Sequence, residues 1–175
     1  MQNNVELFDM QSNVKLIPIA ESDTANIIRW RNSELVKQNL FSSDEVTVEI
    51  HQHWLSEYVM TGKCCQFIIH VEHNPVGTVF LKNIDYDNSK AEFGIFIGES
   101  TAHGKGYGTI ATGLIADFGF QELKLNKIYL SVFHDNKGAI RSYEKAGFKE
   151  EGLMRQEYYK DGHFMDVLQM AMLKP

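Results

Sequence analysis

The sequence predicts a mixed α/β (α+β) fold around a sheet that is mostly antiparallel. Three observations predict it: three strand-like segments with short turns between them, a glycine-rich loop that leads into a helix, and a closing pair of strand-like segments joined by a tight turn. The chain has 175 residues, of which 43% are hydrophobic and 23% charged. This composition is ordinary for a globular protein, and the length is enough to bury a core. We therefore expect a single domain over residues 1–175.

The first third of the chain predicts one strand followed by helices. Residues 13–19 have the pattern of an opening strand, and the polar pair Ser22-Asp23 supplies an N-cap for helical turns that continue to Trp30. A second short helix is expected over about 33–40. In residues 47–58 the apolar side chains recur mostly at helical spacing, which predicts a third helix.

In the middle of the chain the hydrophobic pattern changes to that of strands. Residues 66–72, 75–84 and 90–98 each have a strand-like pattern. The segments between them, 73–75 and 85–89, consist of turn-forming residues. Three strands with such short connections predict an antiparallel meander.

After this meander the pattern alternates between helices and strands. The next three elements are expected in the order helix, strand, helix, over about 107–122, 128–133 and 136–147. Asn136 can cap the second of these helices, and Gly147 is placed to end it with Phe148 packing behind. Residues 149–173 predict two strands joined by Lys160-Asp161-Gly162-His163, which is a strong hairpin signal.

Charge and cysteine content exclude several classes of partner. The 17 Lys and Arg against 23 Asp and Glu give a formal net charge of −6, whereas a surface that binds nucleic acid has to be basic. Met1–Glu6 lacks the basic and apolar parts of a leader, and no apolar run approaches the roughly 18 residues of a membrane span. Cys64 and Cys65 form no C-x-x-C pair, which favours free thiols in a strand. We expect a cytoplasmic protein that binds neither nucleic acid nor a membrane.

Three alternating glycines, Gly104, Gly106 and Gly108, precede the longest predicted helix. Residues without Cβ atoms let consecutive backbone N–H groups turn toward one centre, and a helix N-terminus adds partial positive charge. Lys105 is the only full charge from Ser100 to Ala116, so nothing acidic opposes an anion there. The loop therefore predicts a diphosphate site. The alternative is a turn that needs glycine for its geometry alone.

Three other motifs compete for the same region, and each lacks a required part. Gly106–Ala111 matches G-x-G-x-x-A, but this dinucleotide fingerprint should open a parallel βαβ unit and be followed about 20 residues later by an acid. Here it follows a meander, and Asp135 comes too late. No G-K-[ST] occurs for a Walker loop, and Gly98–Ala102 lacks the last glycine of a hydrolase elbow.

Three segments resemble sequence motifs of one known family. His103–Gly108 fills the positions of Q/R-x-x-G-x-G/A, with His103 where Gln or Arg is usual, and Asn136–Phe148 closely resembles N-x-x-A-x-x-x-Y-E-K-x-G-F. These are motifs of the GNAT superfamily, the acyl-CoA-dependent N-acetyltransferases. Tyr158–Val167 is similar to the closing hairpin of the branch that holds spermidine and ribosomal-protein acetyltransferases. The resemblance covers about residues 13–173.

This resemblance implies a fold, a co-substrate and the residues that bind it. The fold would be a single three-layer domain, with a central, mostly antiparallel sheet splayed between two parallel strands. The co-substrate would be acetyl-CoA, with no metal ion, and a homodimer is compatible with the resemblance. The residues expected to bind acetyl-CoA are Ile95, Phe96, Ile97, His103, Gly104, Lys105, Gly106, Tyr107, Gly108, Thr109, Asn136 and Lys145.

A narrower resemblance concerns the acceptor of the acetyl group. Arg29–Asn32, Glu49–Trp54 and Ala91–Ile95 resemble the aminosugar N-acetyltransferases of nonulosonic (pseudaminic) acid biosynthesis, which acetylate a primary amine on a UDP-linked sugar. The residues expected to contact such a small polar acceptor are Trp30, Arg31, Asn32, His51 and Trp54. Paired N–H donors of Arg29 or Arg31 would suit the diphosphate of a nucleotide sugar.

Three alternatives remain open. A polyamine such as spermidine would need a cluster of carboxylates, and the net charge of −6 suits a cation. The carboxylates that could supply the cluster are Asp44, Glu45, Glu49, Asp85 and Asp87. A ribosomal-protein N-terminus is another acceptor in this branch. The third alternative, from a different class, is a CoA-binding regulatory module without turnover; the full motif with Asn136 and Tyr143 favours the enzyme.

Acetyl transfer to an amine needs a base for the ammonium proton and an acid for the leaving thiolate. Glu92 is the expected base, and its alternative is a solvated carboxylate paired with a lysine. His51 and His53 are rival bases, although such histidines are more often surface residues; at positions i and i+2 they do not share a helix face for a metal ion. Tyr143 is the expected acid, and its alternative is a core tyrosine. A backbone N–H near residues 95–97 would stabilise the oxyanion.

Overall fold

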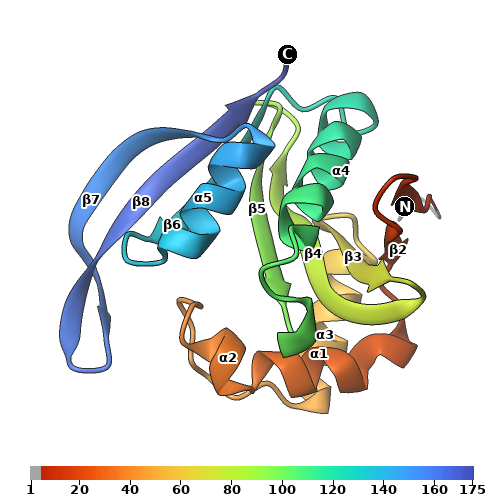
Figure 1. Ribbon diagram of the computed structural model, residues 1–175, viewed down its shortest axis with the longest axis horizontal. Coiled ribbons are helices and arrows are strands. Elements are labelled where there is room, and N and C mark those ends of the chain that lie inside the picture. Colours follow the sequence, from red (N-terminus) through yellow and green to blue (C-terminus); the bar gives the residue numbers. More distant parts are fainter. Residues whose placement is uncertain (1–4) are drawn as a thin grey trace.

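The structure is a computed structural model and describes residues 5–175. Its centre is one sheet of eight strands in the order β1-β2-β3-β4-β5-β6-β8-β7 (Figure 1). Neighbouring strands run antiparallel except β5 and β6, which are parallel. The expected mixed α/β fold with a mostly antiparallel sheet is therefore confirmed. Met1–Asn4, on which part of the expectation about a leader depends, lies outside the described residues.

The elements follow the predicted order. The strands are β1 (Leu7–Asp9), β2 (Val14–Pro18), β3 (Cys64–Val71), β4 (Asn74–Asp85), β5 (Lys90–Ile97), β6 (Lys127–Phe133), β7 (Lys149–Lys160) and β8 (His163–Leu173). The α-helices are α1 (Thr24–Arg31), α2 (Glu34–Lys37), α3 (Val48–Trp54), α4 (Tyr107–Gln121) and α5 (Lys137–Ala146). Short helical turns are η1 (Glu21–Asp23), η2 (Leu55–Val59) and η3 (Ser100–Ala102). Within residues 5–175, no helix has the length and apolar character needed to span a bilayer.

Hydrophobic side chains cover both faces of the sheet. In β3, Phe67 and Ile68 belong to two different cores, because successive residues of a strand point to opposite faces. α4 and α5 lie over the face of the larger core, in which Ile115 of α4 is fully buried (Figure 1). The smaller core, on the other face, contains the fully buried Trp30 of α1. The sheet is thus the middle of three layers.

The two parallel strands separate midway along the sheet. β5 pairs with β6 only over Lys90–Glu92, whose partners are Lys127–Tyr129. Beyond these residues β5 pairs with β4 as far as Ile97, and β6 pairs with β8 as far as Phe133. The groups of β5 that face β6 are therefore released from the sheet over its last residues. This is the splay that the family resemblance implies.

The local signals in the sequence act as expected, and the differences lie in the N-terminal third. Asn136 Oδ1 accepts a hydrogen bond from the backbone N–H of Ala139 at 3.1 Å, which caps α5. Asp161 and Gly162 have φ of +50° and +86°, which suits a tight two-residue hairpin turn. β1 was not expected, and α2 is a single turn rather than a helix over about 33–40.

Candidate active site

Two cavities meet at the end of β5. The first, of about 490 Å³, lies between the glycine-rich loop, the N-terminus of α4, and α5. The second, of about 410 Å³, lies between α1, α3, β4 and β5. We call the residues that line both cavities the shared wall: Asn39, Leu40, Ile95 and Phe96. A molecule in one cavity can therefore meet a molecule in the other at this wall.

The glycine-rich loop presents backbone amides to the first cavity. Gly104 and Gly106 have φ of +73° and +82°, in the left-handed region that favours glycine. A Cβ at either position would meet no atom within 4 Å, so glycine is needed here for its backbone conformation and not to avoid a clash. α4 begins at Tyr107 without an acidic residue in its first turn, and the N–H groups of a first turn have no acceptor within the helix. Together with the helix dipole they form a site for a phosphate or diphosphate.

The first cavity brings together the residues that the sequence assigned to acetyl-CoA. All of them line it except Lys105, which is exposed outside it. Those that line it are Ile95, Phe96, Ile97, His103, Gly104, Gly106, Tyr107, Gly108, Thr109, Asn136 and Lys145. His103 Nε2 lies 3.0 Å from the carbonyl oxygen of Ile97; because a carbonyl only accepts, this nitrogen donates and ties the loop to the end of β5.

Further residues line the first cavity that sequence reasoning missed. They are Leu35, Val36, Asn39, Leu40, Ala102, Gly138, Ala139, Arg141 and Ser142. Those on α5 could have been found, because they lie within one turn of the predicted residues Tyr143 and Asn136 on the same helix. Those on α2 and just after it gave no signal, since nothing local shows that this segment folds back over α5.

Tyr143 lines the first cavity from α5, with its ring in the core. The ring packs edge-on against Phe93, with centroids 5.7 Å apart, and lies near Phe148. Within residues 5–175 the Tyr143 hydroxyl has no hydrogen-bond partner. The one fully buried side-chain polar atom without a partner in these residues is His51 Nε2, so the Tyr143 hydroxyl is not fully buried. Burial raises the pKa of Tyr143 to about 12, so the phenol is protonated at neutral pH. The tyrosine is thus a core residue by its ring and a free donor by its hydroxyl.

Of the residues expected to contact the acceptor, Arg31, His51 and Trp54 line the second cavity. Trp54 Nε1 donates to Gln66 Oε1 at 2.8 Å, and Gln66 Nε2 donates in turn to Thr78 Oγ1 at 3.1 Å. These bonds fix the indole at the edge of the cavity, where it remains partly exposed.

Trp30 and Asn32 line neither cavity, so the structure does not place them against an acceptor. Trp30 is fully buried between α1 and the end of β5, because its large ring completes the smaller core. Asn32 exchanges two hydrogen bonds with the backbone of Val46, at 2.9 and 2.8 Å. Val46 lines the second cavity, so Asn32 shapes it from behind.

His51 is buried, so the alternative of a surface histidine does not hold for it. Its side chain is 3% exposed because α3 packs this face against α1. Nδ1 lies 3.1 Å from Thr24 Oγ1, and Nε2 has no partner among the described residues. Burial lowers the pKa of His51, against the opposing charge of Asp23, so the imidazole is neutral at pH 7. His53 is exposed and lines neither cavity.

Glu92 lines the second cavity with its carboxylate held by two neighbours. Oε1 lies 3.1 Å from Lys82 Nζ, and Oε2 accepts from Asn83 Nδ2 at 2.8 Å. The pairing with a lysine that the sequence left open is therefore present. Each carboxylate oxygen accepts more than one hydrogen bond, so Glu92 still offers an acceptor to the cavity.

The charge of the second cavity is more positive than negative. Among the described residues that line it, Arg31 and Lys82 are cationic and Glu92 is the one carboxylate. Because Lys82 pairs with Glu92, Arg31 is left over, and it belongs to none of the ion pairs within residues 5–175. Burial lowers the pKa of Arg31 while Asp44 opposes that shift, and a guanidinium stays charged at neutral pH. The acidic residues considered for a polyamine, Asp44, Glu45, Glu49, Asp85 and Asp87, do not line this cavity.

A buried lysine from the other end of the chain holds the shared wall. Lys160, the last residue of β7, is 7% exposed. Its Nζ donates to the carbonyl oxygens of Lys37, Gln38 and Leu40 at 2.8, 3.2 and 2.7 Å. The carbonyl of Lys37 also accepts from the backbone N–H of Leu40 at 3.1 Å, so the segment after α2 continues as a turn bound to the ammonium and not as an α-helix.

Two more contacts fix the same segment. The Tyr158 hydroxyl donates to the carbonyl oxygen of Phe41, and Asn136 Nδ2 donates to Asn39 Oδ1 at 3.0 Å. The wall between the cavities is thus held both by the C-terminal hairpin and by the residue that caps α5.

The three-layer fold, the splayed strands and the anion site beside a second cavity define a transferase that uses a phosphate-bearing co-substrate. The family model described as "Acetyltransferase (GNAT) domain" matches residues 13–149, and the chain belongs to this family. The protein is an acetyl-CoA-dependent N-acetyltransferase. The enzyme interpretation therefore holds over that of a module without turnover.

The three relatives that follow are all acetyltransferases; the names of two specify spermidine, and the name of the third specifies no acceptor. The chain is 30% identical over 162 residues to spermidine N(1)-acetyltransferase of Escherichia coli K12, which covers 92% of this chain and 86% of the relative. It is 25% identical over 122 residues to acetyltransferase PseH of Campylobacter jejuni, covering 70% and 74%. The crystal structure of Vibrio cholerae spermidine N-acetyltransferase in complex with CoA and spermine superimposes with a TM-score of 0.87 at 27% identity, covering 93% of this chain and 96% of the other.

Proposed function

We propose that this N-acetyltransferase acetylates the primary amine of a nucleotide-linked amino sugar. The observation that carries the proposal is Arg31, which lines the second cavity and forms no ion pair among the described residues, while Asp44 interacts with it from outside the cavity lining. A guanidinium binds a phosphate through paired, charge-assisted N–H donors, and a diphosphate in the acceptor would supply that partner. The resemblance of residues 29–32, 49–54 and 91–95 to aminosugar acetyltransferases supports the same acceptor.

A polyamine is the second candidate, favoured by the spermidine N-acetyltransferases among the relatives. The charges that line the second cavity do not favour a polyamine. A polyamine carries several positive charges, and Glu92, the one lining carboxylate among the described residues, is already paired with Lys82. The net charge of −6 would attract a polyamine to the molecule without binding it in this cavity.

In the proposed reaction the acetyl group passes from the first cavity to the second at the shared wall, and residues of both cavities take part. The amides of the glycine-rich loop bind the diphosphate of acetyl-CoA, which supplies an activated acetyl thioester. The β6-facing backbone of residues 95–97, released by the splay, stabilises the oxyanion. Glu92 accepts the proton of the acceptor's ammonium, directly or through water, and the neutral amine then attacks the thioester carbonyl. The C–N bond forms, the C–S bond breaks, and Tyr143 donates its proton to the leaving thiolate.

The acceptor is tested with one panel of UDP-amino sugars, spermidine, aminoglycosides and N-terminal peptides, assayed by thiol release. We expect the best UDP-amino sugar to exceed spermidine at least about tenfold in kcat/KM, since one charge-assisted contact contributes about that factor. Arg31→Gln should raise the KM for the sugar nucleotide and leave that for an aminoglycoside, which has no phosphate, unchanged. A tenfold preference for spermidine would contradict the amino-sugar assignment and leave the N-acetyltransferase activity standing.

The base is tested by the pH dependence of kcat/KM in Glu92→Gln. The variant should move the rising limb of the profile to higher pH, because the amine must then lose its proton unaided. Glu151→Gln is the matched control: Glu151 pairs with Lys127 at 2.7 Å on β7, outside both cavities, and its loss should leave the profile unmoved. An unshifted profile in Glu92→Gln would assign the base to His51, His53 or bulk water.

A further inference from the structure

Glu99 stands at the junction between β5 and the glycine-rich loop. It follows Gly98 directly after β5, and the backbone N–H groups of Gly98 and Glu99 both donate to the carbonyl oxygen of Val76, at 2.8 and 3.1 Å. η3 and the loop come next along the chain. The main chain here is thus fixed to β4 without any contribution from the Glu99 side chain.

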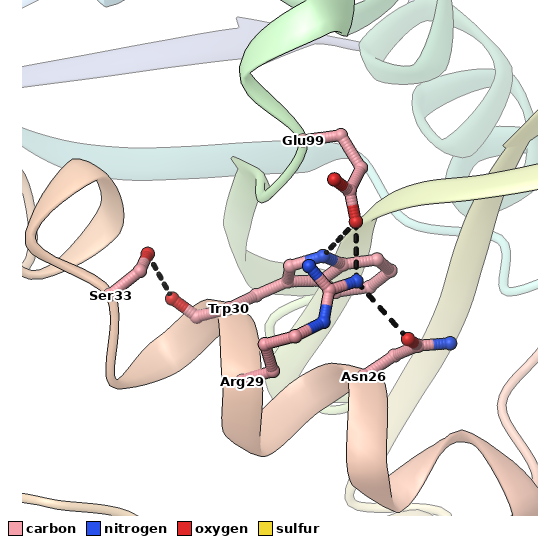
Figure 2. A network of polar contacts seen from close by, with 5 residues as sticks. All are labelled: Asn26, Arg29, Trp30, Ser33 and Glu99. Carbon is pink, nitrogen blue, oxygen red and sulfur yellow. Dashed lines mark hydrogen bonds and ion pairs between the residues drawn. The ribbon is translucent and has the colours of Figure 1, made fainter.

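The Glu99 side chain reaches across to α1 (Figure 2). Its Oε1 accepts a hydrogen bond from Trp30 Nε1 at 2.8 Å and forms an ion pair with Arg29. These hydrogen bonds lower the pKa of Glu99, so its carboxylate is charged at neutral pH. Arg29 also contacts Asn26 on the same helix, at 3.3 Å.

A close contact between backbone and ring occurs at the same place. A Cβ on Gly98 would lie 2.0 Å from Cγ of Trp30, so the indole rests directly on the glycine backbone. Trp30 is fully buried, and Ser33 Oγ donates to its carbonyl oxygen at 2.7 Å. α1 therefore docks on the end of β5 through one ring and one hydrogen bond to Glu99.

This contact connects α1, which lines the second cavity, to β5, which lines both cavities. Ile27 and Arg31 of α1 line the second cavity, on either side of Trp30 in sequence. Ile95 and Phe96 of β5 belong to the shared wall. Whatever holds Trp30 against the end of β5 also sets how far Arg31 stands from that wall.

We propose that Glu99 is a positioning residue that holds α1, and with it Arg31, at the correct distance from the shared wall through its hydrogen bond to Trp30. The inference rests on the proposed function only in that α1 contacts the acceptor, whichever amine that is. The ion pair with Arg29 contributes little, because the Arg29 side chain is 56% exposed and such pairs are screened by solvent. The buried indole, by contrast, loses its partner altogether when the carboxylate is removed.

Three variants separate these contributions. Glu99→Ala removes both contacts and should raise the acceptor KM about tenfold, while the Kd for acetyl-CoA stays within about twofold, since Val76 still holds the loop. Glu99→Gln retains an oxygen that accepts from Trp30 and should restore the acceptor KM. Asn26→Ala, the matched control on the same helix, removes only the 3.3 Å contact between Asn26 and Arg29 and should leave both constants unchanged.

The single variant Trp30→Phe tests the hydrogen bond itself and remains decisive if Glu99→Ala fails to fold; where both fold, a double-mutant cycle joins the two. Trp30→Phe keeps a buried ring and loses the Nε1 donor, so it should show the same rise in acceptor KM, and the double variant should be no worse than either single one. An unchanged acceptor KM, effects that add in the double variant, or an equal loss of acetyl-CoA affinity would overturn the proposal. The test uses whichever acceptor the wild-type enzyme prefers, so a wrong choice of amine is a separate result.

Discussion

Tyr143→Phe should lower kcat by about 10²–10⁴-fold, the range that general acid catalysis contributes, and leave the Kd for acetyl-CoA unchanged. The phenyl ring keeps its packing against Phe93 and Phe148, so the fold and the wall of the first cavity are retained. The variant loses the one hydroxyl of this tyrosine, which has no partner in the described chain and faces the cavity. Single-turnover rates of acetyl transfer measure the effect, and wild-type turnover in the variant would leave Tyr143 a core residue only.

The pH dependence gives a second check on Tyr143. A phenol donates only while protonated, so its contribution is lost as pH rises through the pKa of about 12 that burial gives it. An unperturbed tyrosine would already ionise near 10. We therefore expect no fall in kcat from this group between pH 8 and 10. A falling limb near pH 10 that Tyr143→Phe removes would contradict the buried environment.

Gly106→Val should abolish acetyl-CoA binding and leave the fold largely intact. Valine is strained at a φ of +82°, so the loop must leave the conformation that directs its amides into the first cavity. No atom lies within 4 Å of the added Cβ, so the substitution meets no neighbour in the protein itself. For the wild type, acetyl-CoA at about 100 times its Kd adds roughly 2.7 kcal/mol to the free energy of unfolding.

Thermal unfolding with and without millimolar acetyl-CoA measures this effect. Gly113→Ala is the matched control, because Gly113 lies in α4 away from the loop and a Cβ there also meets nothing within 4 Å. It should keep the full increase in Tm with ligand and gain up to about 1 kcal/mol from helix propensity. An undiminished ligand shift in Gly106→Val would show that the loop is not the anion site.

Sequence reasoning succeeded where the information is local. The glycine-rich loop before a helix, the Asn136 cap and the turn at Asp161-Gly162 each follow from a few neighbouring residues, and the structure has all three. The residues assigned to acetyl-CoA come together in the first cavity, Lys105 excepted, because the loop and the helix N-terminus are adjacent in sequence.

The features of the site that local sequence patterns do not show depend on contacts between distant segments. Helical spacing shows which residues share a face, but not that the face of His51 is buried against α1, so the sequence left a surface position open as the alternative for that histidine. Trp30 was expected at the acceptor from the resemblance to aminosugar acetyltransferases, and no local pattern shows that Glu99, 69 residues later, binds its indole. The excess of positive charge in the second cavity likewise arises only because the fold brings Arg31 and Lys82 together.

The contacts of Lys160 with residues 37, 38 and 40 can form only after the ribosome has added the lysine. Leu40 and Lys160 are 120 residues apart, so at 5–20 residues per second the ribosome adds the lysine roughly 6–24 s after the leucine. Before then a nascent chain that has reached α5 already contains the glycine-rich loop, but the carbonyls of Lys37, Gln38 and Leu40 have no ammonium to turn toward. The glycine-rich loop is thus synthesised before Lys160, the residue that holds the Leu40 side of the shared wall in place.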